Sequence, residues 1–277
     1  GRSRGRPVDP LSRLSVGRSV AAPLKLISWN CNGLRSVLAK GVLQELVEAE
    51  RPDVLLLQET RVQVEPDGMD GFEGWHRAWN PAVRPGYSGT AVLSRLPIED
   101  ARVGAGRDRR DPEARVLTVD LPGLTVVSAY GVNARRDLSR LPERVRFDAA
   151  LTRHLRTRTR RRPVVLGGDL NVAPTADDLA RPGPNKGRSG CTAEERDAFA
   201  AHLAAGYVDA YRHLNPDGRD WTWWSNVTNA RERDVGWRID HWLVSRRLRG
   251  GLRRAWALQH VRGSDHCPIG LELDLPA

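Results

Sequence analysis

The chain has 277 residues, of which 40% are hydrophobic and 28% charged, and its 44 Lys and Arg against 34 Asp and Glu give a formal net charge of +10. No run approaches the ~18 consecutive apolar residues that a membrane-spanning helix needs, which excludes a helical membrane protein and predicts a soluble one. The three cysteines show neither a CxxC pair nor a metal-ligand spacing, which predicts free thiols in a reducing compartment.

The first 25 residues hold much of the positive charge. They carry six Lys and Arg against one Asp, a net charge of +5, so half of the excess lies outside the body of the chain. The net charge alone therefore supports a polyanionic partner only weakly. Residues 1–23 are rich in Arg, Ser, Gly and Pro and lack the apolar region of a secretory signal. We expect a disordered basic tail that adds nonspecific affinity for DNA, with an organelle transit peptide as the alternative.

Beyond the tail, short apolar runs alternate with amphipathic segments. Strands are predicted at residues 24–30, 53–58, 90–95, 116–121, 125–130, 164–168, 239–245 and 269–275, and helices at residues 37–50, 142–156 and 193–204. The first strand, helix and strand form a predicted βαβ unit, whose two strands run parallel. Many strands with few helices indicate an α/β fold, a β-sandwich flanked by helices. Residues 24–277 show no linker or internal repeat, so we expect a single domain.

Polar residues follow the predicted strands at the points where they end. If the first two strands are parallel, Asn30 and Glu59 emerge at the same end of a sheet, and Asp169 and Asn171 follow another buried strand. A carboxylate in such a position incurs a desolvation cost unless it is paired or bound to a cation. Carboxylate and amide oxygens are the ligands that hard divalent cations such as Mg²⁺ prefer. Each residue alone could be a cap or a surface side chain, but together they indicate a site.

Four short segments carry these polar groups: residues 28–35 (SWNCNGLR), 57–60 (LQET), 167–174 (GGDLNVAP) and 263–268 (GSDHCP). In this order they resemble the signatures of the endonuclease/exonuclease/phosphatase superfamily, and specifically of its exonuclease III and apurinic/apyrimidinic endonuclease branch. The resemblance extends over residues 24–275. It implies a four-layered α/β sandwich of the DNase I-like type, two packed sheets flanked by helices, with the active site at one edge.

The resemblance also implies a metal site. Its metal set comprises Asn30, Glu59, Asp169, Asn171, Asp265 and His266. Three of these residues, Asn30, Glu59 and Asp265, would hold Mg²⁺, with Mn²⁺ as an alternative cofactor.

Five residues are the implied catalytic groups. Asp169 would orient or deprotonate the attacking water and Asn171 would bind the scissile phosphate. His266 would stabilise the pentacovalent transition state, with Asp240 behind it to fix its orientation and raise its pKa. Tyr130 would supply a phenolic group near the phosphate; a strand-end tyrosine packed on the surface is the alternative. These roles agree with the charge that develops on phosphate oxygens during in-line hydrolysis.

The loop after Tyr130 departs from the family pattern. Residues 129–134 resemble a Tyr-x-Pro-Asn element, but Val132 stands where proline is usual. The departure affects the expected geometry of the loop and not the presence of Tyr130.

A tryptophan-rich region, residues 221–240, resembles the abasic-pocket region of the same branch. Trp223, Trp237 and Ile239 would line an apolar slot for a flipped-out sugar, since a slot of this size excludes a nucleotide that still carries its base. The implied DNA-binding residues are Asn32, Arg35, Tyr87, Asn133, Arg136, Arg140, Asn185, Arg188, Trp223, Arg231, Trp237 and Ile239, with Arg144 and Lys186 as further candidates. Contacts to phosphates predict an affinity that falls with salt.

The densest basic run, residues 153–162, is interpreted as a solvated face and not as the DNA site. It precedes the strand 164–168 whereas Asp169 follows it, so about six residues, or on the order of 20 Å, separate the run from the catalytic end.

We therefore expect a magnesium-dependent DNA-repair phosphodiesterase that hydrolyses double-stranded DNA 5′ to abasic sites, with 3′–5′ exonuclease and 3′-phosphodiesterase or phosphatase side activities. A general exonuclease, a phosphoesterase of small molecules and a non-catalytic DNA-binding relative are the alternatives. The protein is expected to act as a monomer in the cytoplasm, associated with the nucleoid if it is bacterial, without contact with a membrane.

Overall fold

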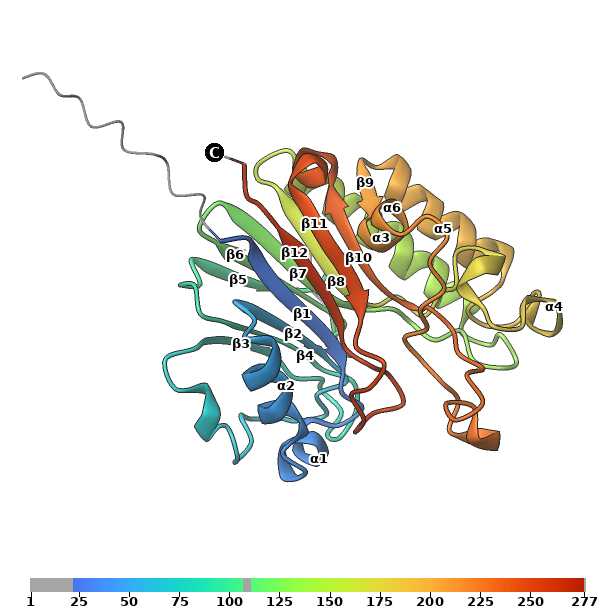
Figure 1. Cartoon of the computed structure of the whole chain (residues 1–277). Coiled ribbons are helices and arrows are strands. Elements are labelled where there is room, and N and C mark those ends of the chain that lie inside the picture. Colours follow the sequence, from blue (N-terminus) through green and yellow to red (C-terminus); the bar gives the residue numbers. More distant parts are fainter. Residues whose placement is uncertain (1–21, 107–110, 277) are drawn as a thin grey trace, which may run out of the picture.

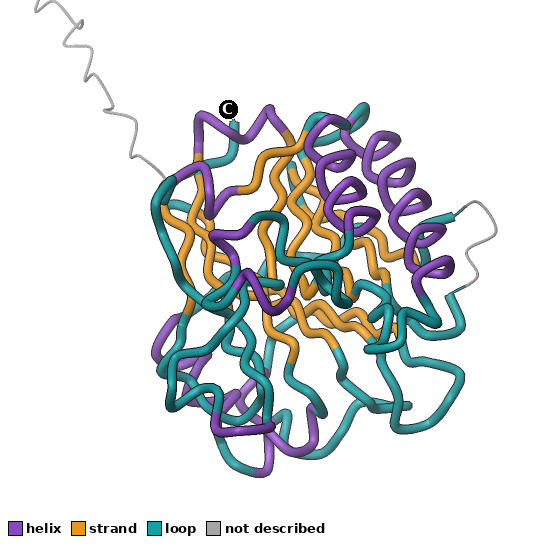
Figure 2. The backbone as a smooth tube through the Cα atoms, turned by 90° about the vertical axis from the view of Figure 1, so that its right-hand side faces the viewer, coloured by secondary structure: helices purple, strands orange, loops and turns teal. Residues whose placement is uncertain are grey.

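The computed structural model describes residues 22–106 and 111–276, so the predicted tail lies outside the described residues except for its last two positions. Two six-stranded β-sheets pack face to face. Helices lie on the outer faces of the sheets (Figure 1), and the side view in Figure 2 shows strands and helices as separate layers. The predicted four-layered α/β sandwich is confirmed.

The first sheet has the strand order β11–β12–β1–β2–β4–β3. Its strands are β1 (Leu24–Asn30), β2 (Val54–Gln58), β3 (His76–Asn80), β4 (Thr90–Ser94), β11 (Leu252–Ala257) and β12 (Ile269–Leu273). β1 and β2 run parallel, as predicted, and the other neighbours are antiparallel. Because Asn30 is paired with Gln58, the residues that follow both strands lie at one end of this sheet.

The second sheet has the order β5–β6–β7–β8–β10–β9. Its strands are β5 (Asp100–Val103), β6 (Val116–Leu121), β7 (Leu124–Tyr130), β8 (Val164–Asp169), β9 (Tyr207–Asp209) and β10 (Asp240–Ser245). β7 and β8 are parallel, and β10 is antiparallel to β8. This register places Tyr130, Asp169 and Asp240 in one row across three strands.

Helices cover the outer face of each sheet. Their bounds are α1 (Leu34–Ala39), α2 (Val42–Glu50), α3 (Leu141–Thr159), α4 (Pro182–Asn185), α5 (Ala193–Ala204) and α6 (Ala210–Leu214), with 3₁₀ turns η1 (Asp70–Phe72), η2 (Ala176–Asp178), η3 (Val227–Asn229) and η4 (Arg246–Gly251). α1 and α2 bury leucines and valines against β1 and β2, and α3 and α5 pack on β7, β8 and β10. The largest apolar cluster lies between the two sheets, where Leu26 and Leu56 of one meet Val126 and Trp242 of the other.

Some elements differ from the prediction. The helix expected at residues 37–50 is broken at Gly41, which has a left-handed conformation with φ of 71°, so α1 and α2 are separate. The strands β3, β5, β9 and β11 were not predicted. β5 is only 4 residues long and exposes its two apolar residues, β11 carries Arg254 where an alternating pattern would need an apolar residue, and β9 is only 3 residues long.

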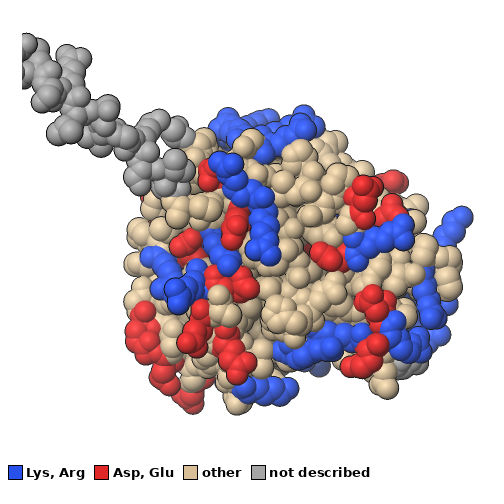
Figure 3. Space-filling view, in the orientation of Figure 1, with Lys and Arg blue, Asp and Glu red and all other residues tan. Residues whose placement is uncertain are grey.

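Other features of the sequence can also be located in the structure. No helix in the described ranges is long and apolar enough to cross a membrane. All three cysteines are free and buried. The basic run lies on the last turns of α3 and the turn into β8, so it precedes the strand that ends at Asp169. Basic and acidic side chains are interspersed over the face shown in Figure 3, which fits a mildly basic body.

Candidate active site

The chain approaches itself closely just before Asp169. A Cβ on Gly167 would lie 2.2 Å from the indole of Trp242, and a Cβ on Gly168 would lie 1.9 Å from the carbonyl oxygen of Ala129. Only glycine fits at these two positions, which lets β8 lie flat between β7 and β10. The carboxylate of Asp169 consequently emerges level with Tyr130 on one side and Asp240 on the other.

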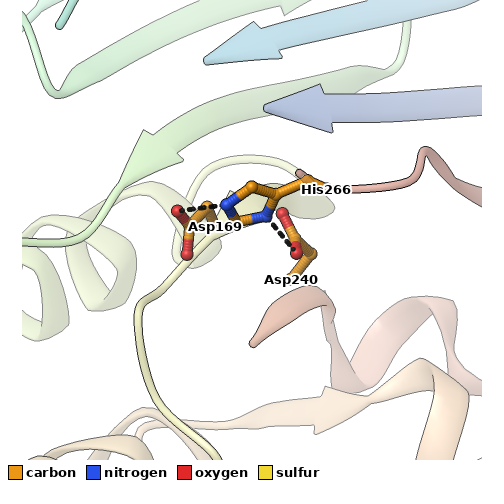
Figure 4. A group of neighbouring side chains, drawn as sticks. All are labelled: Asp169, Asp240 and His266. Carbon is orange, nitrogen blue, oxygen red and sulfur yellow. Dashed lines mark hydrogen bonds and ion pairs between the residues drawn. The ribbon is translucent and has the colours of Figure 1, made fainter. Parts of the chain in front are cut away.

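His266 lies beside this row and connects two of its carboxylates (Figure 4). Its Nδ1 is 2.8 Å from Asp240 Oδ2, and its Nε2 is 3.7 Å from Asp169 Oδ2. The loop that carries His266 is attached to β1, because Ser264 donates to the carbonyl of Asn30 at 2.8 Å and the indole of Trp29 donates to the carbonyl of His266 at 3.2 Å. Residues far apart in the sequence are thereby held as one buried group.

The charges in this group set its protonation. Burial alone would lower the pKa of His266, but the carboxylates of Asp240 and Asp169 raise it to about 10, so the imidazole is protonated at neutral pH. Burial raises the pKa of Asp169, and the charge of His266 opposes that shift, leaving it at about 7. A carboxylate whose pKa lies near neutrality is suited to accept a proton from water.

Glu59 and Asp265 form a second, more open pair of carboxylates. Glu59 accepts hydrogen bonds from Asn30 Nδ2 at 2.9 Å and from Arg61 at 2.6 Å, and Asp265 accepts from Asn32 Nδ2 at 2.8 Å and from the indole of Trp223 at 3.0 Å. Burial disfavours their charged forms, yet these donors and His266 lower the pKa of both. Both side chains are therefore ionised.

Three residues of this region, like eight other non-glycine residues of the described chain, have a left-handed backbone conformation. Asn32, Glu59 and Asn171 have φ values of 48°, 49° and 49°, in the left-handed region that residues other than glycine rarely adopt. Strain of this kind persists where surrounding contacts impose it, and it is common at functional sites.

Two sets of side chains could hold a metal ion. Asp169, Asp240 and His266 offer ligand atoms that all lie within 4.8 Å of one another. In that set, Nδ1 of His266 is committed to Asp240, which leaves Nε2 and the carboxylate oxygens as the atoms that could face a cation. Glu59 and Asp265 are ionised oxygen donors at the cleft and suit a hard cation better.

Asn171 and Asn133 connect the carboxylate row to the loop after β7. Asn171 donates from Nδ2 to the carbonyl of Gly131 at 3.1 Å, and its backbone N–H donates to Asp169 Oδ1 at 2.8 Å. Asn133 donates to Asn171 Oδ1 at 3.2 Å. Burial and the charges of Glu59 and Asp169 raise the pKa of Tyr130, which keeps its phenol protonated as a donor.

A cleft of about 870 Å³ opens over these groups, with Glu59, Tyr130, Asp169, Asn171, Asp265 and His266 among its lining. One wall is apolar. Trp223 and Trp237 meet edge to face, with ring centroids 5.7 Å apart, and Ile239 lies beside them. The predicted slot residues therefore share one cleft with the predicted catalytic residues.

The predicted DNA-binding residues lie in several places. The residues that line the cleft are Asn133, Arg136, Asn185, Arg188, Trp223, Trp237 and Ile239. Tyr87 and Arg140 line a separate hollow, where the guanidinium of Arg140 is paired with Glu113 and Glu143. Asn32 contacts Asp265, and Arg35 is an exposed residue of α1. Lys186 is exposed at the end of α4.

Two arginines have contacts that the sequence did not indicate. Arg144 is only 1% exposed, pairs with Asp148 and donates to backbone carbonyls, so its prediction as a phosphate contact is wrong. Arg231 donates to the carbonyls of Gln259, Val261 and Ser264, so its guanidinium supports the loop before Asp265 and does not line the cleft.

Three further residues of the site were not predicted from the sequence. Arg181 lines the cleft. Arg61 contacts Glu59 and follows the recognised segment 57–60 directly. Arg115 is 3% exposed, lies 4.5 Å from the ring centroid of Tyr130 and donates to the carbonyls of Tyr130 and Gly131. Its position at the start of an apolar run was the available signal, because a charged residue buried there needs partners.

Comparison with known proteins extends over nearly all of the described chain. The model of the Endonuclease/Exonuclease/phosphatase family matches residues 27–266. An exodeoxyribonuclease of Bacillus subtilis is 40% identical over 255 residues, covering 91% of this chain and 100% of that protein. A DNA-(apurinic or apyrimidinic site) endonuclease of Dictyostelium discoideum is 40% identical over 260 residues, covering 91% and 71%. The solved structure of the 3′ phosphatase NExo from Neisseria, bound to product DNA hairpin, matches with a TM-score of 0.85 at 30% identity, covering 91% and 99%.

Proposed function

The chain belongs to the endonuclease/exonuclease/phosphatase family, and we propose that it is a DNA-repair nuclease of the exonuclease III type that hydrolyses double-stranded DNA 5′ to abasic sites. One observation carries the proposal. The hydrolytic groups Asp169 and His266 and the apolar slot of Trp223 and Trp237 line the same cleft. A flipped-out sugar in the slot would lie next to the groups that cut its backbone.

Asp169 and His266 are suited to opposite tasks in phosphodiester hydrolysis. We assign Asp169 as the base that orients and deprotonates the attacking water, since its pKa of about 7 allows both protonation states at working pH. The protonated His266 faces the same space and would neutralise charge that develops on the phosphate oxygens. Asp240 holds the imidazole in place through its 2.8 Å contact with Nδ1.

The side chains around the phosphate position complete the centre. Tyr130 carries a protonated phenol at the cleft that can donate to a phosphate oxygen, and Asn171, whose amide contacts Gly131 and Asp169, would bind the phosphate by exchanging one of these contacts. Glu59 and Asp265, with the amide oxygen of Asn30 nearby, would hold Mg²⁺, with Mn²⁺ as an alternative. When bound, the ion would polarise the phosphate and neutralise its charge.

The slot explains selection of damaged DNA. A baseless nucleotide is stacked and paired weakly, so it costs little to extrude. Trp223 is fixed by its hydrogen bond to Asp265, which ties one wall of the slot to a proposed metal ligand. A nucleotide with its base would need the wall to move and would lose alignment with Asp169.

The same cleft also suits the removal of blocked 3′ ends. The guanidinium groups of Arg136, Arg181 and Arg188 line it and provide positive charge for a terminal phosphate. The Neisseria relative is named a 3′ phosphatase. We therefore include 3′–5′ exonuclease and 3′-phosphatase activities in the proposal, exercised by a monomer on duplex DNA.

A cleavage assay tests the proposal. A duplex with one abasic analogue and an otherwise identical intact duplex are incubated with the protein in Mg²⁺, in EDTA, and after Mg²⁺ is restored. We expect incision 5′ to the analogue to exceed cleavage of the intact duplex by about tenfold or more and to require the cation. Equal rates on the two duplexes would contradict the abasic assignment, and full activity in EDTA would contradict the metal requirement.

A further inference from the structure

Arg238 stands between two residues of the slot but points into the protein. It separates Trp237 from Ile239 in the chain, and it is 2% exposed. Its guanidinium donates to Asp178 Oδ1 at 2.8 Å and to the two carboxylate oxygens of Asp209 at 3.2 and 2.8 Å. The group is therefore held by two buried carboxylates from separate elements, η2 and β9.

The same guanidinium is connected to the loop that follows Asp169. Arg238 Nη1 lies 3.0 Å from His241 Nδ1, and His241 Nε2 lies 2.9 Å from the carbonyl oxygen of Val172. Burial and the charge of Arg238 lower the pKa of His241 to about 4, so its ring is neutral. With a single N–H, the ring satisfies both contacts when Nε2 donates to Val172 and Nδ1 accepts from Arg238. Val172 is three residues beyond Asp169.

Backbone hydrogen bonds couple the position of the slot wall to that of Arg238. The N–H of Arg238 donates to the carbonyl of Asp178 at 2.9 Å, and Trp237 forms bridges with Leu179 on one side and Trp223 on the other. A change in the position of Arg238 would therefore move Trp237 and Ile239 together. His241 connects Arg238 to the carbonyl of Val172, close to Asp169, so the loss of this connection would let Trp237 and Ile239 shift relative to Asp169.

We propose that Arg238 is a positioning residue for substrate selection: its guanidinium, held by Asp178, Asp209 and His241, sets the placement of Trp237 and Ile239 relative to Asp169. The inference rests on the proposed function and deepens it. The planar fork of arginine presents donors in several fixed directions at once, whereas lysine presents a compact ammonium that cannot span the same partners. Small misplacements of a reacting group produce large losses of rate.

The test compares Arg238→Lys with Arg212→Gln. Arg212 donates to the same oxygen of Asp178 at 2.7 Å, but its side chain is 26% exposed, and among the described residues its guanidinium has no hydrogen bond to Asp209 or His241; only its backbone N–H, which the substitution keeps, donates to Asp209. It is a matched control, since its loss removes an ion pair of Asp178 without releasing the slot. For each protein kcat and KM are measured on the abasic duplex and on exonucleolytic removal of intact terminal nucleotides, together with the melting temperature.

We expect Arg238→Lys to lower kcat/KM on the abasic duplex by about tenfold while removal of intact nucleotides changes by less than about threefold. We define the selectivity ratio as kcat/KM on the abasic duplex divided by kcat/KM for removal of intact terminal nucleotides. This ratio should fall in Arg238→Lys and stay at the wild-type value in Arg212→Gln, even where both variants melt at a lower temperature than the wild type. An unchanged ratio in Arg238→Lys would show a merely structural role and overturn the inference.

Failure of the proposed function and failure of the role of Arg238 give different results. A wild-type protein that cuts the abasic duplex no faster than the intact duplex of the cleavage assay refutes the proposed function itself, whereas a wild type that prefers the abasic duplex, with an unchanged ratio in Arg238→Lys, refutes only the role of Arg238. If Arg238→Lys shows no cooperative melting, Asp209→Asn takes its place and is judged by the same ratio. That variant weakens one side of the fork and keeps the guanidinium with Asp178.

Discussion

Two buried clusters of charged side chains lie along the segment 237–241, and each contains a histidine. His266 contacts Asp240 and Asp169, and its pKa is raised to about 10. His241 contacts Arg238, and its pKa is lowered to about 4. Both rings are fully or nearly fully buried. The two histidines therefore have similar solvent exposure and opposite protonation at neutral pH.

The sign of the nearest charge accounts for the difference. Burial lowers the pKa of both rings, since it disfavours the charged form. Beside His266 the carboxylates reverse this effect, whereas beside His241 the guanidinium of Arg238 adds to it. The cluster of His266 opens on the cleft and retains a proton for chemistry. The cluster of His241 is sealed, and its neutral ring serves as a connector between segments.

The largest expected effect comes from removing the ionisable groups of the open cluster. His266→Asn and Asp169→Asn should each reduce cleavage of the abasic duplex by about 10³-fold, because a general base or a charge-stabilising group is lost. Binding of the same duplex, measured by fluorescence anisotropy in EDTA, should be retained. His154→Asn is the control: this half-buried ring contacts Thr118, and neither residue lines the cleft. Cleavage unchanged by Asp169→Asn would overturn its assignment as the base.

A change behind His266 should be smaller and dependent on pH. Asp240→Asn removes a carboxylate that raises the pKa of His266, so the ring will lose its proton at lower pH than in the wild type. We expect kcat/KM at neutral pH to fall by about 10- to 100-fold and the alkaline limb of the pH–rate profile to move to lower pH. A profile whose alkaline limb stays in place would show that protonation of His266 is not what Asp240 controls.

The sealed cluster should make the stability of the protein depend on pH. His241 stays neutral in the folded protein down to about pH 4, whereas in the unfolded chain it takes up a proton below about pH 6.5. Between these values the unfolded chain binds more protons, so this residue makes the free energy of unfolding decrease as pH falls, by roughly 1–3 kcal/mol over the window. Between pH 7 and 4, the free energy of unfolding measured with urea should decrease less for His241→Gln than for the wild type. His154 and His202, whose pKa values are also lowered, remain in both proteins.

The smallest effect should come from single exposed arginines, one at the cleft beside the open cluster and one far from either cluster. Arg188→Ala removes an exposed guanidinium that lines the cleft, and it should weaken DNA binding several-fold and reduce the salt dependence of affinity by about one phosphate contact. Arg160→Ala removes an exposed guanidinium at the end of α3 and should leave both unchanged. Equal effects of the two substitutions would show that the basic run also contacts DNA.

Much of the site was accessible from local patterns. Apolar runs that end in Asn30, Glu59 and Asp169 indicated strands with polar ends, and parallel pairing of β1 and β2 followed from the βαβ order. Irregular or polar strands such as β5 and β11 were missed, because they are stabilised by their neighbours in the sheet and not by a pattern of their own.

The amino-acid sequence by itself predicted the fold class and the polar groups that follow the strands, since these depend on residue type and on short spacings, and its resemblance to the family indicated the tryptophans of the predicted slot. Only the tertiary structure decided which arginines face the cleft and which are structural. Nothing in the sequence distinguishes Arg144 from Arg188, yet Arg144 is buried and donates to backbone carbonyls, whereas Arg188 lines the cleft. The protonation of His266 and His241 was likewise decided by partners far away in the chain, because the charge nearest to a buried ring depends on how distant segments pack.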